Sequence, residues 1–112
     1  MTAASQVAPR HLRAATRAWF SSVVEDFAME AHHRRILQVA GEAWDRAQLA
    51  REALKRHGLV YRDRFGSPKA RPEVGIARDA MVVFMRAVRE LRLDVGQPAE
   101  DERPPRLLER VR

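Results

Sequence analysis

The sequence predicts a mainly α-helical fold: an antiparallel helical hairpin, then a third helix, with a short β-hairpin or extended flap between the second and third helices. Two observations predict it. Apolar residues recur at steps of three and four along three segments, as they do on one face of a helix. A stretch with strand propensity and turn residues separates the last two segments. The 112 residues suffice for one small domain, which we place at 10–94, between a disordered N-terminus (1–9) and a flexible tail (95–112).

The first helix is expected over about 11–26. Its apolar spacing is carried by Leu12, Ala15, Trp19, Val23 and Phe27. Arg10, Arg13 and Arg17 surround its start, and no acidic residue precedes Glu25. Positive charge at a helix N-terminus opposes the macrodipole, so these arginines are explained either by an anion bound there or as a small defect on an exposed surface.

A long second helix is expected over 30–57, after a two-residue connection that folds it back on the first helix. Gly58 follows it, as a glycine often does at a helix C-terminus. Its apolar stripe consists of Ile36, Ala40, Ala43, Ala47, Ala50 and Leu54, widened by Leu37, Trp44 and Leu49. Alanine lets another backbone approach closely, so the stripe packs within its own monomer or part of it faces a neighbouring subunit. The candidate oligomer-interface residues are Ala40, Ala43, Trp44, Ala47 and Ala50, with Met81 and Met85, which are alternatively core residues.

The segment 58–72 has a different character. Leu59, Val60 and Tyr61 favour a strand, and the turn residues follow at 65–68. From residue 55 to residue 71 there are six basic residues against one acid, with two aromatic residues among them. Arginines beside aromatic rings suit phosphate contact and base stacking, whereas the alternative is a solvated turn whose charges protect a sheet edge. The candidate nucleic-acid-binding residues are Arg56, Arg62, Arg64, Lys69 and Arg71, and Arg10, Arg13 and Arg17 form a second group.

The third helix is expected to begin near Pro72 and Glu73, because proline suits the first turn and a carboxylate complements the helix dipole. Its buried face is predicted to comprise Ile76, Ala80, Val83, Phe84, Ala87, Val88 and Leu91. After Asp94 the chain turns to glycine, proline and mixed charge, which is typical of a tail that orders only on a partner.

The composition favours binding over catalysis. There are 21 Lys and Arg against 15 Asp and Glu, a net charge of +6, which favours a polyanionic partner or reflects arginine-rich codon usage. No cysteine is present, the histidines lack paired metal-ligand spacing, and no glycine-rich phosphate loop or catalytic constellation is found. We therefore expect neither enzyme activity, nor a cofactor, nor a metal. Without an apolar leader or membrane-spanning run, the protein is expected to be soluble and intracellular.

The order of these segments resembles that of the small subunits of phage terminases. In the first two helices the matching residues are Pro9, His11, Leu12, Trp19, Trp44, Asp45, Arg46 and Ala47. Arg13 stands where that family usually has a serine or threonine helix cap. A "GL-x-Y-x-D-x-x-G-x-P" hairpin is matched at 58–68, and a "P-x-x-x-x-x-x-D" third helix at Pro72 and Asp79.

This resemblance implies a role in packaging viral DNA. Such subunits form homo-oligomeric rings, recognise double-stranded viral DNA and regulate the large subunit, which holds the ATPase and nuclease. They are not enzymes themselves, and they act in the cytoplasm of the infected bacterium. Two alternatives remain: a small helical DNA-binding regulator, and an adaptor whose helical stripe and tail bind other proteins.

Overall fold

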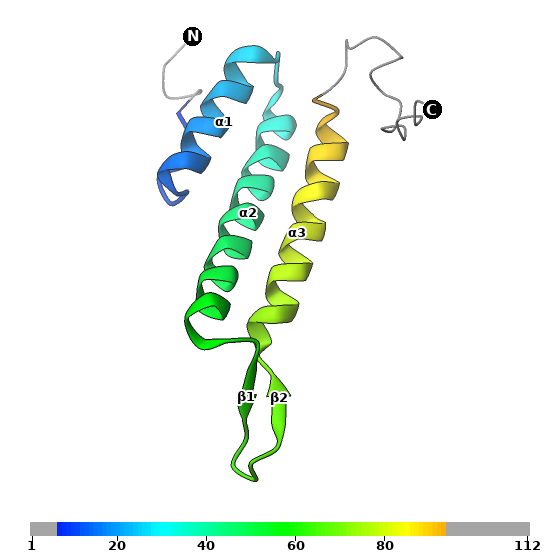
Figure 1. Cartoon of the computed structure of the whole chain (residues 1–112). Coiled ribbons are helices and arrows are strands. Elements are labelled where there is room, and N and C mark those ends of the chain that lie inside the picture. The colour runs from blue at the N-terminus through cyan, green and yellow to red at the C-terminus, as the bar shows by residue number, and fades with distance from the viewer. Residues whose placement is uncertain (1–6, 94–112) are drawn as a thin grey trace, which may run out of the picture.

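The computed structural model describes residues 7–93, which form three helices and one β-hairpin (Figure 1). In chain order the elements are α1 (Ala14–Asp26), α2 (Ala31–His57), β1 (Val60–Arg62), β2 (Pro68–Ala70) and α3 (Pro72–Leu91). Helix α2 lies between α1 and α3 and runs antiparallel to both, and the hairpin extends beyond the helices at one end. The predicted fold class is confirmed, whereas the predicted tail at 95–112 lies outside the described residues.

Helices α2 and α3 pack along most of their length (Figure 1). The four alanines of the α2 stripe, Ala40, Ala43, Ala47 and Ala50, are between 0 and 4% exposed. Ala80 and Ala87 of α3 are buried as well. Small side chains let the backbones of neighbouring helices approach closely, so the alanine stripe is used inside the monomer. Our assignment of these four alanines to an oligomer interface was therefore wrong, because they are not on the surface.

The largest of the fully buried side chains, Leu12 and Leu37, lie in a core where α1 packs on α2. Leu12, Phe20, Val23 and Leu37 form this core together with Ala8. Ala8 is only 6% exposed, so the prediction of a disordered segment over 1–9 is wrong at this position. The burial of Ala8 ties the chain before α1 to the helical body.

Two helix boundaries differ from the predicted ones. Helix α1 begins at Ala14 instead of residue 11, because a turn precedes it in which the Leu12 N–H donates to the Pro9 carbonyl at 3.3 Å. Helix α2 begins one residue late, since Glu30 serves as its N-cap in a reciprocal capping box with His33. Both differences arise from side-chain and turn contacts that apolar spacing does not record.

Candidate nucleic-acid interface

The β-hairpin is held together by local hydrogen bonds. Its register pairs Val60 with Ala70, Tyr61 with Lys69 and Arg62 with Pro68. The Asp63 carboxylate accepts the Phe65 N–H at 2.8 Å and the Ser67 N–H at 3.0 Å.

The backbone of Asp63 takes part in the same turn. Its N–H donates to the Ser67 carbonyl at 3.0 Å, and its carbonyl accepts the Gly66 N–H at 2.9 Å. Gly66 has a φ of 80°, in the left-handed region that glycine enters without strain. One aspartate and one glycine thus organise the loop that joins the two strands.

The hairpin contributes nothing to the hydrophobic core. All six strand residues are exposed, and so are Leu59 and Phe65. An isolated two-stranded hairpin is marginal in water, so this one depends on its turn and on its attachment to α2 and α3. Its side chains are available to a partner on both faces.

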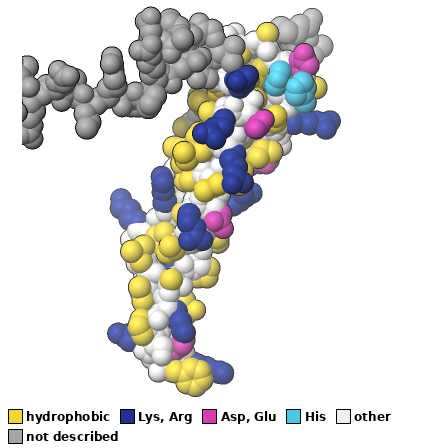
Figure 2. Space-filling view, turned by 90° about the vertical axis from the view of Figure 1, so that its right-hand side faces the viewer, with side chains coloured by type: hydrophobic (Ala, Val, Ile, Leu, Met, Phe, Trp, Pro, Cys, Tyr) yellow, Lys and Arg dark blue, Asp and Glu magenta, His cyan; other side chains and the backbone are white. Residues whose placement is uncertain are grey.

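The predicted basic residues of the hairpin lie at the narrow end of the molecule, and Figure 2 shows Lys and Arg side chains there as well as along the helices. Arg62, Arg64 and Lys69 are exposed, and Arg71 is half-buried at the base of the hairpin. Arg56 is exposed in the last turn of α2, where positive charge also complements the helix dipole. Across residues 7–93, none of these side chains forms an ion pair with a carboxylate. Their charges are therefore not held in ion pairs within the described chain, although the charge of Arg56 contributes to lowering the pKa of Glu52.

Two arginines of the hairpin lie over aromatic rings. The Arg64 guanidinium is 4.9 Å from the centre of the Phe65 ring, and the Arg71 guanidinium is 6.0 Å from the centre of the Tyr61 ring. Such cation–π contacts hold a guanidinium without removing its charge. The Arg62 guanidinium instead donates to the Gly66 carbonyl at 2.7 Å and so closes the turn. The hairpin presents charged groups in defined positions.

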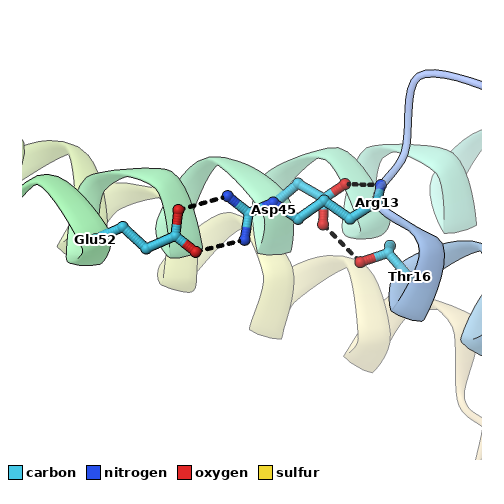
Figure 3. Close-up of polar contacts among 4 residues, drawn as sticks. All are labelled: Arg13, Thr16, Asp45 and Glu52. Carbon is cyan, nitrogen blue, oxygen red and sulfur yellow. Dashed lines mark hydrogen bonds and ion pairs between the residues drawn. The ribbon is translucent and has the colours of Figure 1, made fainter.

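The second predicted group of arginines has a different role. Arg13 makes a bidentate ion pair with Glu52 of α2, with N–O distances of 2.8 and 2.9 Å (Figure 3). This pairing raises the pKa of Arg13 and lowers the pKa of Glu52. The Arg17 guanidinium donates to the carbonyls of Leu12 and Arg10. The Arg13 charge is thus paired with a carboxylate and Arg17 is engaged with backbone carbonyls, whereas contact of either residue with DNA stays a prediction.

Asp45 explains how α1 begins without a local cap. No side chain caps α1 from Arg13, its N-cap residue. Instead the Asp45 carboxylate of α2 accepts the Arg13 N–H at 2.8 Å and the Thr16 hydroxyl at 2.5 Å (Figure 3). A carboxylate at a helix N-terminus also complements the helix dipole, which offsets the nearby arginines. Sequence reasoning missed Asp45 and Glu52 as partners of the α1 arginines, because they lie 32 and 39 residues from Arg13.

An apolar groove lies where α1 and α3 flank α2. Its volume is about 260 Å³, and it is lined by Ala15, Thr16, Trp19, Trp44 and Phe84. The Phe84 ring centre is 5.0 Å from that of Trp44 and 6.0 Å from that of Trp19. Of the predicted interface residues, Trp44 and Met85 keep exposed surface, Met81 is half-buried, and the alanines are inside.

Within 7–93, no three His, Asp or Glu side chains are grouped so that they could hold a metal ion. In the same range, no helix is long and apolar enough to cross a membrane.

Comparison of the chain with known protein families, with curated proteins and with solved structures gives no match. The resemblance to terminase small subunits thus stays a prediction from the motifs.

Proposed function

We propose that this protein binds double-stranded DNA through the β-hairpin. The observation that carries the proposal is the cluster of unpaired basic side chains on an exposed element that has no part in the core. Most of the affinity in protein–DNA complexes comes from contacts to phosphates, which arginine and lysine supply. The only acid of the hairpin, Asp63, does not oppose this role, because its carboxylate is engaged by backbone N–H groups.

We further propose that the DNA is a viral genome and that the protein is the non-catalytic small subunit of a phage terminase. The motif resemblance supports this role, with a ring of identical subunits, a large subunit as partner and the host cytoplasm as location. In a ring each subunit would present one hairpin, so that weak phosphate contacts add up through high effective concentration. The groove beside Trp44 and the exposed Met85 supply apolar surface for contacts between subunits or with the large subunit.

The DNA-binding proposal is tested by removing two charges from the hairpin. We expect Arg62→Ala with Arg64→Ala to weaken binding to a labelled duplex about tenfold and to reduce the salt dependence by about one slope unit for each lost phosphate contact. Fluorescence anisotropy over a salt series measures both quantities.

The matched control is Arg35→Ala with Arg51→Ala, which removes the same charge from exposed positions on α2. An equal loss of affinity for the two double variants would show that overall charge, not the hairpin, governs binding. Unchanged binding by the hairpin variant would also overturn the proposal.

The ring is tested by the native mass in solution, measured by light scattering after size exclusion at low and moderate salt. A closed oligomer of many 12.8 kDa subunits supports it. A monomer or dimer at every concentration contradicts it and favours the adaptor alternative, for which the groove at Trp19, Trp44 and Phe84 is the available surface.

The regulator alternative has less support from the structure. A helix-turn-helix places a short helix and a tight turn before its recognition helix. Here α2 has 27 residues, and a β-hairpin precedes the next helix.

A further inference from the structure

We infer that Phe65 is a wedge that inserts between base pairs from the minor groove and kinks the DNA. This inference rests on the proposed function, since it concerns how the same hairpin engages a duplex. It adds a mechanical role for the tip, distinct from phosphate contact by the arginines.

The side chain of Phe65 is not explained by the fold. It is 78% exposed and stands at the end of the hairpin, remote from the helical core. The turn requires only its backbone N–H, which Asp63 accepts at 2.8 Å, so a polar residue would serve the turn equally well. The Arg64 guanidinium covers part of the ring, and the rest is available to a molecule outside the monomer.

The backbone beneath the ring is held firmly, as a wedge requires. Asp63 binds the N–H groups on both sides of Gly66, and the Arg62 guanidinium binds the Gly66 carbonyl. These bonds join the end of β1 to the backbone of residues 65–67. Separating two stacked base pairs costs free energy, so the backbone that carries an inserted side chain must be rigid.

Basic side chains lie beside Phe65 in the chain, and one of them contacts its ring. Arg62 and Arg64 are exposed on the chain before Phe65, and the Arg64 guanidinium lies over one face of the ring. Proteins that kink DNA from the minor groove combine an apolar wedge with basic side chains that follow the negative groove.

The inference predicts bending of the bound duplex. We expect the full-length chain to raise energy transfer between dyes at the two ends of a duplex of about 30 base pairs. Phe65→Ala should abolish this change while leaving the salt dependence of binding intact, because the phosphate contacts remain. Phe65→Leu should restore part of the bend, since leucine is also an apolar wedge.

A second measurement compares an intact duplex with one that carries a central mismatch. Because a mismatch is already partly unstacked, a wedge should bind it at least about tenfold more tightly, and Phe65→Ala should lose that preference. Leu59→Ala is the matched control, since Leu59 is an exposed apolar residue at the base of the hairpin. It should change neither the bend nor the preference.

The outcomes separate this inference from the proposal on which it rests. Binding without bending by the wild type, or equal bending by Phe65→Ala, overturns the wedge and leaves DNA binding in place. Tighter binding of single strands than of any duplex overturns the wedge in favour of base stacking. Absence of binding to every duplex overturns both.

Discussion

The helical body and the β-hairpin each contain an aspartate that accepts hydrogen bonds from backbone N–H groups. The two aspartates differ in how far along the chain their partners lie. Asp45 is 9% exposed and binds the start of α1 across 32 residues. Asp63 is half-buried and binds N–H groups two and four residues further along. In the body, arginine charge is also paired over long range, as between Arg13 and Glu52. In the hairpin, carboxylate and guanidinium groups are not paired with each other.

This difference shows that a count of basic residues does not measure the charge available to a partner. Three arginines around α1 and three in 62–71 look alike in the sequence. Around α1, Arg13 pairs with Glu52 and Arg17 binds backbone carbonyls of the preceding turn, whereas no hairpin arginine is paired with an acid in the described chain. Stability and DNA binding should therefore respond to separate sets of substitutions.

The largest expected effect is on the stability of the body. Leu37 is fully buried in the core between α1 and α2. Leu37→Ala should lower the free energy of unfolding by about 2–5 kcal/mol, because it removes buried surface and leaves a cavity. Chemical denaturation measures this loss. The folded fraction should still bind DNA with wild-type affinity, and weakened binding by folded protein would contradict the separation of the two regions.

Asp45→Ala is expected to have the next largest effect. It leaves the Arg13 N–H and the Thr16 hydroxyl without their acceptor, at a cost of about 1–3 kcal/mol in the free energy of unfolding. Hydrogen exchange should accelerate in the first turn of α1 and not in the hairpin. Asp79→Ala, at an exposed position of α3, is the control and should change stability little. Equal effects of the two substitutions would rule out a capping role for Asp45.

Asp63→Ala should reduce DNA binding more than stability, in contrast to Asp45→Ala. It removes two local hydrogen bonds from an element outside the core, so the free energy of unfolding should fall by no more than about 1 kcal/mol. The loosened turn should nevertheless weaken DNA binding, because the arginines and Phe65 lose their fixed positions. Ser67→Ala keeps the backbone N–H that Asp63 binds, and it should behave like the wild type in both assays. Wild-type DNA affinity for Asp63→Ala would show that the order of the turn is irrelevant to binding.

The smallest expected effect is the contribution of Glu52 to the acid sensitivity of the body. The hydrogen bond from Arg13 lowers the pKa of Glu52, so the folded state favours the ionised carboxylate. This stabilisation is fully present above the ordinary pKa of a glutamate and is lost as the pH falls through the lowered value. Glu52→Gln should therefore flatten the loss of stability in acid, measured by thermal unfolding at a series of pH values. Superimposable acid profiles for variant and wild type would show that the pair contributes nothing.

Much of the hairpin and of the candidate site could be predicted from the sequence. The turn depends on Asp63 and Gly66, whose partners lie within four residues, and Gly58 ends α2 with a φ of 84°. Short-range preferences of this kind act in any fold, so they can be inferred from residues that are adjacent in the sequence. The first group of candidate basic residues could be identified for the same reason, because all of them lie in the hairpin or next to it in the chain.

The sequence by itself determined the three helices, the hairpin and the exposure of Arg62, Arg64 and Lys69 within it, because periodicity and turn chemistry are local properties. Only the tertiary structure decided that the alanine stripe is buried within the monomer, that Ala8 joins the core and that Arg13 pairs with Glu52. Each of these depends on which surfaces meet after the chain folds back on itself. Side chains that are distant in sequence become partners only then. Whether an arginine stays a free surface charge or forms an ion pair with another helix therefore depends on the packing.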